Sequence, residues 1–562
     1  MRYTHTMPPP RPLTRMPAPS LDFSRPGTPA ADDFGDIYFS TDGGLEEARA
    51  VFLHGCGLPE RWQGRAVFTI AELGFGSGLN FLAAWQSWRQ SGAKGRLHFI
   101  SVEGFPFERA ALERALNHFP ELADLACPLI DSWPGPVRGV HRRHFGDVTL
   151  TLVHDDVIPA LASQAFETDA WFLDGFSPAR NPAMWSPAVM AEVARLSAPD
   201  ARLATFTVAG AVRRALGEAG FAVERREGFG RKRHRLEARL IGERRTRAAP
   251  LVPTIIGAGI AGASIAGAFR RRGLTPRVCH DPGHIAASGN GAALVKPRLD
   301  LQDNPASRFF LASYLYARHI YADAVRHEGL SHIAKTAKES ERFHRIAAQE
   351  PLGPGGLVWT GEALAIPGAM VIDTEAAKTR LLDGIDVQAR PLGALDDADG
   401  PLILACGYGI RALLPGSDYR FSRGQLSWTS GTLEAPVTYG GYAVPIRDRI
   451  LIGATHDRLV KGEDPFTLRV GDDARNLAQA EARGLPVGPD TESHRASVRV
   501  TTADTLPRMG PIGLPDGRRA HILSGLGSRG FTFAPLLGEA LVSDYLGEPG
   551  PLERGFAARI AP

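Results

Sequence analysis

Three glycines near the middle of the chain have the spacing of a dinucleotide-binding turn. Gly257, Gly259 and Gly262 follow a short β-branched run and precede an Ala-rich stretch that predicts a helix. The first glycine permits a tight turn, the second lets the backbone approach a pyrophosphate, and the third lets the helix pack on the sheet. A structural turn needs similar glycines, and the uncharged run 253–269 is shorter than the ~20 residues of a membrane span. The strand before the glycines and the helix after them favour a nucleotide-binding loop.

A second glycine-rich turn lies in the first half of the chain and has a different spacing. A predicted strand ends at Glu72, and Gly74, Gly76 and Gly78 alternate after it before a predicted helix at 79–88. This pattern resembles motif I of the Rossmann-like S-adenosylmethionine methyltransferases. The resemblance implies that the loop wraps around the methionine and ribose of that cofactor.

Acidic residues follow the next two predicted strands. Glu103 comes after the strand at 97–102, where a carboxylate can accept both ribose hydroxyl protons, although a surface Glu in a loop is the plain alternative. Asp155 and Asp156 come after the strand at 148–153, where acids that contact adenine often lie in this fold. We therefore expect all three carboxylates to bind the cofactor.

Asp174 follows a buried strand predicted at 170–173 and precedes Gly175, so the chain turns sharply at a strand end. Ligands bind at this edge in open α/β sheets. Pro178 and Pro182 stiffen the loop that follows. Three further predicted strands complete a seven-strand sheet, with a helix at 211–219 between the first two: 202–208, 221–225 and 236–241.

The loop Asp174-Gly-Phe-Ser-Pro-x-Arg-Asn-Pro-x-Met-Trp resembles the methyltransferase half of the bacterial bifunctional tRNA 5-methylaminomethyl-2-thiouridine biosynthesis proteins. The same resemblance extends over residues 30–242 through four shorter segments: 36–40, 61–62, 103–106 and 228–233. Cys56 departs from the family, in which a small polar residue is expected. The resemblance implies that Asp174 acts on the substrate amine, either as a base or by orienting it.

A cationic run follows, and it has two interpretations. It could hold tRNA phosphates beside the cofactor pocket, or it could be a solvated face. Its ten basic residues are Arg225, Arg226, Arg231, Lys232, Arg233, Arg235, Arg239, Arg244, Arg245 and Arg247.

The second half resembles flavoproteins of the glycine oxidase and D-amino-acid oxidase type. Ser288, Gly289 and Asn290 belong to a small-residue segment that lies along the flavin diphosphate in those proteins. The resemblance therefore implies FAD rather than NAD. The ribose-binding position falls on His280 by spacing, with Asp281 one residue later, and we choose Asp281.

Two later segments agree with a flavin site. Gly527, Ser528, Arg529 and Gly530 resemble the loop whose amides approach the flavin pyrimidine, and alternating runs at 424–429, 442–446 and 449–453 predict an antiparallel sheet. Arg499 matches the oxidase Arg that binds a substrate carboxylate, a task that suits a guanidinium fork. A surface salt bridge is the alternative for Arg499. Arg423 and Gln425 are expected to line the same pocket.

The length of 562 residues indicates at least two domains, because single cores stop growing at roughly 250–300 residues. The expected class is α/β, with a Rossmann-like methyltransferase domain followed by an FAD-binding Rossmann domain that carries an antiparallel-sheet substrate domain. The expected divisions are a disordered tail at 1–30, the methyltransferase at 31–245, a linker at 246–252 and the oxidoreductase at 253–562.

The composition adds bounds of its own. The four cysteines are far apart and form no C-x-x-C pair, which favours a reducing compartment without a disulfide framework or zinc site. The Pro- and Arg-rich N-terminus lacks the apolar core of a signal peptide. We expect a cytoplasmic monomer that binds tRNA, with no membrane partner and no metal.

Together the two halves imply one two-step enzyme. The flavin site would oxidise the C–N bond of a carboxymethylaminomethyl group on the wobble uridine, U34, releasing glyoxylate and leaving an aminomethyl group. The first site would then methylate that amine. The alternatives are a small-molecule amine or amino-acid oxidase fused to an unrelated methyltransferase, and a flavin-bound assembly or RNA-binding module without turnover.

Overall fold

The computed structural model describes most of the chain, namely residues 11–23, 29–31, 35–38, 43–230, 232–243, 251–391, 400–460 and 462–562. Several predictions fall outside these ranges: parts of the tail at 1–30, most of the linker at 246–252, residues 39–40, and Arg231, Arg244, Arg245 and Arg247. The described residues form two compact units. One contains residues 11–14, 251–542 and 556–562, and the other contains residues 15–243 and 543–555.

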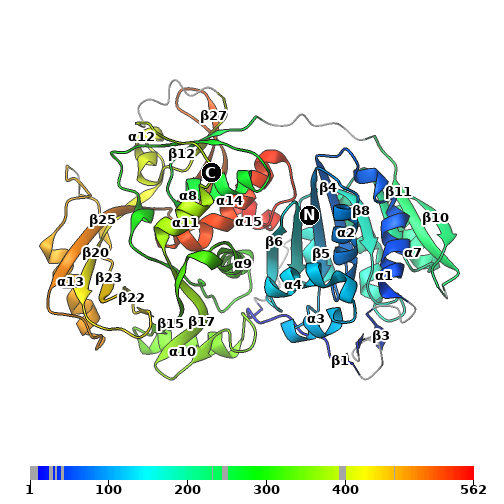
Figure 1. The fold of residues 1–562 in the computed structure, drawn as a ribbon, viewed down its shortest axis with the longest axis horizontal. Helices are drawn as coiled ribbons and strands as arrows, with labels where there is room; N and C mark the ends of the chain where they lie inside the picture. The colour runs from blue at the N-terminus through cyan, green and yellow to red at the C-terminus, as the bar shows by residue number, and fades with distance from the viewer. Residues whose placement is uncertain are drawn as a thin grey trace, which may run out of the picture. The chain divides into compact units, whose positions relative to one another are not determined.

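The unit that contains residues 15–243 is built on an eight-stranded sheet (Figure 1). Its centre is parallel, and antiparallel pairs close both edges. In sheet order the strands are β10 (Phe221–Glu227), β11 (His234–Leu240), β9 (Ser197–Thr205), β8 (Thr168–Leu173), β4 (Val67–Leu73), β5 (Arg96–Glu103), β7 (Val148–His154) and β6 (Gly139–Phe145).

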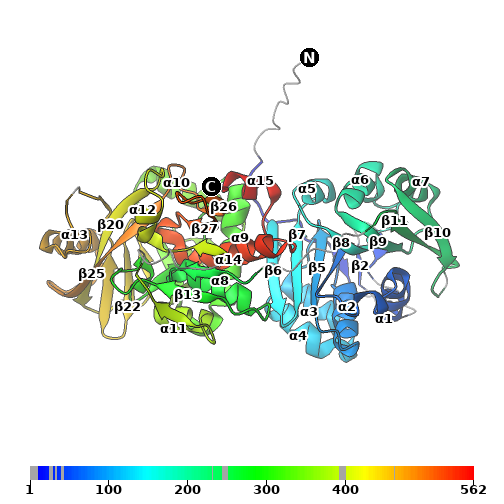
Figure 2. The same cartoon turned by 90° about the horizontal axis from the view of Figure 1, so that it is seen from above.

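Helices cover both faces of this sheet (Figure 2). The central strands are buried on both faces, as parallel strands between two helix layers must be. The first layer contains α1 (Gly44–Glu47), a π-helix (Ala48–Leu53), α2 (Leu79–Gln90), α3 (Arg109–Leu116) and α4 (Ala123–Asp131). The second contains α5 (Val157–Ala162), α6 (Pro187–Arg195) and α7 (Gly210–Glu218). Three short strands precede them: β1 (Leu21–Asp22), β2 (Ala30–Ala31) and β3 (Asp36–Ile37).

Strand β6 was not among the seven predicted strands, because its sequence is rich in charged residues and histidine. It is nevertheless mostly buried. Arg142 is fully buried (0% exposed) and donates from Nη1 to Ser543 Oγ at 3.0 Å and from Nη2 to the Pro549 carbonyl at 2.6 Å. The segment 543–555 therefore supplies partners for β6, which explains its place in this unit.

The other unit begins with a six-stranded sheet. In order, its strands are β18 (Val387–Ala389), β13 (Arg277–His280), β12 (Thr254–Ile256), β19 (Leu402–Leu404), β27 (Arg519–Ser524) and β26 (Arg508–Gly513). All pairs are parallel except β26 with β27. Helix α8 (Ile260–Arg270) follows β12 at the glycine turn, as the sequence predicted.

A second, ten-stranded sheet carries the predicted antiparallel runs. Its members are β14 (Ala293–Val295), β15 (Val325–Ile333), β16 (Val358–Trp359), β17 (Ala363–Ile372), β20 (Arg420–Ser430), β21 (Val437–Thr438), β22 (Tyr442–Ile446), β23 (Arg449–Gly453), β24 (Asp457–Arg458) and β25 (Thr491–Thr501). The helices around the two sheets are α9 (Pro305–Ile320), α10 (Ala337–Ala348), α11 (Thr374–Leu381), α12 (Ile410–Leu413), α13 (Val470–Glu481), α14 (Gly530–Leu546) and α15 (Arg554–Arg559). Within the described ranges, no helix is both long and apolar enough to cross a bilayer.

Candidate active sites

The carboxylate of Asp174 lies at the end of β8, in contact with a residue that the sequence did not single out. Asn80 Nδ2 donates to Asp174 Oδ2 at 2.8 Å and to Glu72 Oε1 at 2.9 Å, so one amide joins two acids from neighbouring parallel strands. Ser101 Oγ donates to the other oxygen of Glu72 at 2.7 Å. Asn80 is a buried polar residue in the apolar run of α2, and that is the signal by which the sequence could have revealed it.

Burial changes the protonation of both acids. It raises the pKa of Glu72 to about 8, and the carboxylates of Asp174 and Glu103 add to the rise. It raises the pKa of Asp174 to about 6, while the hydrogen bonds from the Gly175 N–H and from Asn80 oppose the shift. At neutral pH Glu72 is therefore mostly protonated, and Asp174 is mostly a carboxylate that can accept a proton.

The glycine turn after β4 packs directly against the Asp174 loop. Gly74 has φ +88°, and a Cβ at this position would lie 3.1 Å from the Gly175 Cα. Gly76 N–H donates to Glu103 Oε2 at 2.8 Å, and Phe105 N–H donates to Oε1 at 2.8 Å. The loop N–H groups therefore fix the Glu103 carboxylate at the turn, and its role as the ribose ligand stays a prediction. The structure thus brings Glu72, Gly74, Gly76, Gly78, Glu103 and Asp174 to one edge of the sheet.

Tyr38 covers this edge from outside the sheet. Its ring makes edge contacts with Phe107 and Phe176 at centroid distances of 4.7 and 5.3 Å. A Cβ on Gly76 would lie 3.0 Å from Tyr38 Cδ1, so the glycine is also needed for this close approach. Asp36 Oδ2 accepts a hydrogen bond from Ser177 N–H at 3.1 Å. Residues 36–38, the described part of the family segment 36–40, therefore contact the Asp174 loop.

The other residues predicted in the first half of the chain lie in different environments. Asp155 is buried in an ion pair with Arg138, whereas Asp156 is exposed at the start of α5. Cys56 is a core residue, and burial raises its pKa to about 12. Among the described cations of the basic run, Arg226, Lys232, Arg235 and Arg239 pair with carboxylates. That pairing favours the solvated-face interpretation for these four residues.

The dinucleotide turn in the other unit needs each of its glycines for a separate reason. Gly257 has φ +115°, and a Cβ there would lie 2.4 Å from the Ala405 carbonyl oxygen. A Cβ on Gly262 would lie 1.7 Å from the Gly257 carbonyl oxygen, so the helix could not pack on the turn. Gly259 faces Ser288, whose Oγ accepts from the Ile260 N–H at 3.1 Å. Ser288 is thereby fixed at the N-terminus of α8, where a pyrophosphate would bind.

A cavity of about 1090 Å³ opens over this turn, and most of the predicted flavin residues line it. These residues are Gly257, Gly259, His280, Asp281, Ser288, Asn290, Gly527, Ser528, Arg529 and Gly530. Gly262 and Gly289 are not on the lining, and Gly289 instead permits the approach of Arg495. Asp281 Oδ1 accepts from Gly283 N–H at 2.9 Å, and its role as the ribose ligand stays a prediction.

Two observations show that these residues fit FAD. Small-molecule sites usually have volumes of roughly 300–1,000 Å³, and this cavity is slightly larger than that range, as suits a dinucleotide. Asn290 Oδ1 is buried without a hydrogen-bond partner among the described residues, so an acceptor is available beside the turn. When bound, FAD would be held by the Gly257 turn, the Ser288 segment and the Gly527 loop.

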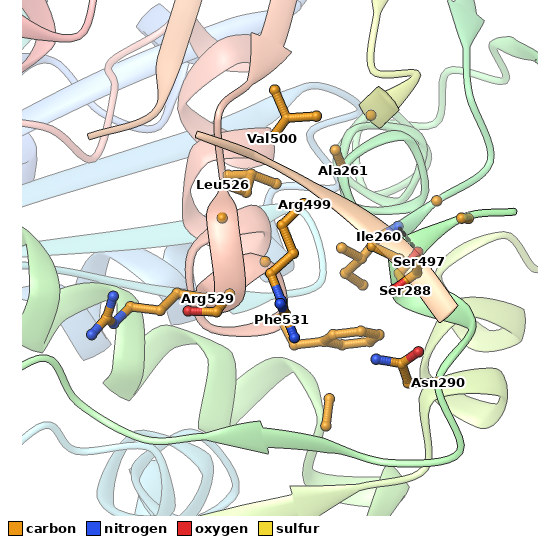
Figure 3. Close-up of a pocket in the computed structure, with 18 of the residues that line it drawn as sticks. Ile260, Ala261, Ser288, Asn290, Ser497, Arg499, Val500, Leu526, Arg529 and Phe531 are labelled. Carbon is orange, nitrogen blue, oxygen red and sulfur yellow. Dashed lines mark hydrogen bonds between the residues drawn. The ribbon is translucent and has the colours of Figure 1, made fainter. Parts of the chain in front are cut away.

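Arg499 projects from β25 into this cavity, toward the space beside Phe531 and Asn290 (Figure 3). Its Nη1 donates to the Thr455 carbonyl at 3.2 Å, and no described carboxylate pairs with it. A Cβ on Gly424 would lie 2.3 Å from Nη1, so Gly424 leaves room for the guanidinium. Burial lowers the pKa of Arg499, although the guanidinium stays charged. A buried cation without an acidic partner is suited to bind an anionic group.

The expectation that Arg423 and Gln425 line the same pocket is wrong. Arg423 is 1% exposed and pairs with Asp472, and Gln425 donates to Asp473 Oδ1 at 2.9 Å. Both side chains therefore face α13, while Gly424 between them faces Arg499. Side chains alternate along a strand, so residues 423 and 425 lie on the same face of β20. Both faces of this strand are buried, and the sequence therefore could not show which face lines the cavity.

The flavin cavity is also lined by basic residues that were not among the predicted site residues. Lys296 Nζ lies 3.3 Å from His332 Nδ1 and donates to Thr438 Oγ1 at 3.1 Å. Burial and, to a lesser extent, nearby cations led by Arg529 lower the pKa of Lys296 to about 7. Its signal in the sequence is weak, because a lysine after a short strand is common on protein surfaces.

Comparison with known proteins assigns both halves. A family model described as S-adenosyl-L-methionine-dependent methyltransferase matches residues 120–241, and one described as FAD dependent oxidoreductase matches residues 367–543. The tRNA 5-methylaminomethyl-2-thiouridine biosynthesis bifunctional protein MnmC of Maricaulis maris is 42% identical over 96% of this chain and 95% of its own. The protein of the same name from Caulobacter vibrioides is 43% identical over 94% of each chain. A solved iminodiacetate oxidase from Chelativorans sp. BNC1 aligns with 55% of this chain and 98% of its own at 20% identity and a TM-score of 0.44, too distant to add to the assignment.

The chain therefore belongs to the family of the tRNA 5-methylaminomethyl-2-thiouridine biosynthesis bifunctional protein MnmC. It is a methyltransferase and an oxidoreductase in one polypeptide, and its cofactors are S-adenosyl-L-methionine and FAD. The roles of individual site residues stay predictions.

Proposed function

We propose that the protein carries out the last two steps in building a 5-methylaminomethyl group on the wobble uridine of tRNA. The observation that carries this proposal is identity of 42% across 96% of the chain, which spans both sites in one relative. A fusion of an unrelated methyltransferase to a small-molecule oxidase would not match one bifunctional protein from end to end. Because tRNA is the substrate, the cytoplasm is the expected compartment.

In the first step, the carboxymethylamino group of the nucleotide enters the cavity of the oxidoreductase unit. Arg499 binds its carboxylate, and Thr455, through its carbonyl, fixes the guanidinium. FAD, when bound, supplies the two-electron acceptor. The C–N bond between the amine and the carboxymethyl carbon becomes an imine, water adds to that carbon, and glyoxylate leaves. An aminomethyl group remains on the uridine.

In the second step, Asp174 receives that amine. An alkylammonium has no free lone pair, so it must lose a proton before it can attack a methyl group. The Asp174 carboxylate, held by Asn80 and by the Gly175 N–H, accepts a hydrogen bond from the ammonium and then its proton. S-adenosyl-L-methionine supplies the methyl group, and the product is a secondary amine.

Flavin reduction tests the proposal. The purified full-length protein is mixed without oxygen with bulk tRNA from a strain that lacks the gene, and separately with glycine or sarcosine. The proposal predicts that the tRNA bleaches the flavin and that the small amines do not at similar concentrations. Bleaching by glycine or sarcosine alone would support the small-molecule oxidase instead.

A further inference from the structure

Four basic side chains gather around His332 in the lining of the flavin cavity, and we call them the cationic rim: Lys296, Lys335, Arg342 and Arg529. Lys335 and Arg342 are exposed, so they lie where the cavity opens to solvent. Within the described ranges, none of the four is paired with a carboxylate. This differs from the basic run of the other unit, in which four of the described cations have acidic partners.

Neutral groups hold these side chains in place. Arg342 Nη2 donates to the Leu299 carbonyl at 3.1 Å, and Lys296 Nζ donates to Thr438 Oγ1 at 3.1 Å. Gly440 has φ +108°, and a Cβ there would lie 2.3 Å from Lys335 Cε, so the lysine lies directly against the backbone. Lys296 and Arg342 are therefore held by hydrogen bonds, and Lys335 packs against the backbone at Gly440.

The rim has a net positive charge, because Lys335, Arg342 and Arg529 are cations and Lys296, with a pKa of about 7, is about half protonated at neutral pH. The pKa of His332 is lowered to about 3, first by burial and then by Lys296, Lys335 and Arg342. Glu339 is the acid beside them, and its carboxylate accepts the Lys335 backbone N–H at 2.8 Å. Cations that outnumber the acids beside them repel one another, and an anionic ligand reduces that repulsion.

We propose that the cationic rim binds phosphates of the RNA backbone on either side of the nucleotide that enters the flavin cavity. This inference rests on the proposed function, since it takes the substrate to be a nucleotide within tRNA. The modified group must reach Arg499 inside the cavity while the backbone stays outside, at the residues that line the opening. Phosphate contacts of this kind give affinity and position without reading sequence.

Helix α10 offers a matched pair of variants. Lys335→Gln with Arg342→Gln removes two rim charges just before and on this helix. Lys338→Gln with Arg345→Gln removes two exposed charges from the same helix that do not line the cavity. Both double variants change the net charge equally, so long-range electrostatics is the same in each.

The assay compares full-length holoenzymes for tRNA binding at several salt concentrations and for flavin reduction. Removing one cation–phosphate interaction with a single strand lowers the salt slope by about 0.7, so the slope of the rim variant should be smaller by about 1.4. We expect its affinity for tRNA to fall about tenfold or more, and the control to stay within about twofold. The free modified nucleoside has no flanking phosphates. The fold loss of its flavin-reduction rate in the rim variant should therefore be smaller than the fold loss with tRNA by a factor of about ten or more.

Four results would contradict the proposal that the cationic rim binds RNA phosphates. Equal losses in both double variants would mean that only net charge matters. Loss of flavin from the Lys335→Gln, Arg342→Gln protein would assign the rim to the cofactor. Equal losses with tRNA and with the nucleoside would place the rim in catalysis. A wild-type protein that is reduced by neither tRNA nor the nucleoside would contradict the proposed function itself, and the rim with it.

Discussion

Replacing Asp174 with Asn tests whether this residue accepts a proton in catalysis or only forms the turn before Gly175. In the protein, Oδ1 accepts from the Gly175 N–H at 2.8 Å and Oδ2 accepts from Asn80 Nδ2 at 2.8 Å. An amide has one oxygen, so Asp174→Asn keeps one of these hydrogen bonds and loses the charge. The donor that loses its acceptor costs about 1–3 kcal/mol in stability, and the variant's folding is checked by urea unfolding.

The expected loss of methylation is a loss of rate, separate from this structural cost. Removing a general base lowers a rate by roughly 10²–10⁴-fold, and the lower limit corresponds to about 2.7 kcal/mol. The pH dependence identifies the cause. Since burial raises the pKa of Asp174 to about 6, the base form is present above pH 6 and is lost as the pH falls below it. The ratio of wild-type to variant rate should therefore be constant above about pH 6 and fall below it, and the protonation of the amine cancels in this ratio.

The assay supplies each protein with tRNA that carries the aminomethyl group and with S-adenosyl-L-methionine, and follows the methylated nucleoside. Asp124→Asn, an exposed acid of the same unit, is the control and should keep the wild-type rate. A variant at position 174 that methylates at the wild-type rate would refute the catalytic role. A loss of rate that is independent of pH would mean that Asp174 only orients the amine.

Three further predictions concern the rest of the molecule. Arg499→Ala should retain flavin but slow its reduction by tRNA severely, since losing a buried charged partner typically costs about 2–5 kcal/mol. Stopped-flow spectra measure the rate of flavin reduction. Unchanged kinetics would mean that another residue binds the substrate carboxylate. Gly257→Ala should yield a colourless protein that still methylates aminomethyl tRNA, because the added Cβ would lie 2.4 Å from the Ala405 oxygen; a normal flavin spectrum would contradict this. Arg142→Met should destabilise the methyltransferase unit by at least about 1–3 kcal/mol in urea, because the Pro549 carbonyl loses its donor, whereas exposed Arg109→Met should have little effect.

The sequence predicted the elements that carry the two glycine turns because turn chemistry is local. Gly257 and Gly74 need backbone conformations that favour glycine, and the strands before them are apolar runs. A strand end and the resemblance both pointed to Asp174, whereas Arg499 was chosen from the resemblance alone. These positions follow from order along the chain and require no knowledge of distant contacts.

The features that the sequence did not predict depend on packing between residues far apart in the chain. Strand β6 reads as polar, and its burial depends on residues 543–555, some 400 positions later along the chain. Asn80 joins two acids from different strands, and no spacing rule brings those three residues together. Arg423 has the right residue type for the carboxylate site, but α13 provides Asp472 on the other face of its strand.

The two-step account is tested most directly by one reaction analysed for nucleosides. The purified protein is incubated in air with tRNA from a strain that lacks the gene, with and without S-adenosyl-L-methionine. Without the methyl donor, the carboxymethylaminomethyl nucleoside should convert to the aminomethyl form with release of glyoxylate. With the donor, the methylaminomethyl form should accumulate instead. A carboxymethylaminomethyl nucleoside that stays unchanged in both reactions, with a protein that holds FAD, would contradict the account.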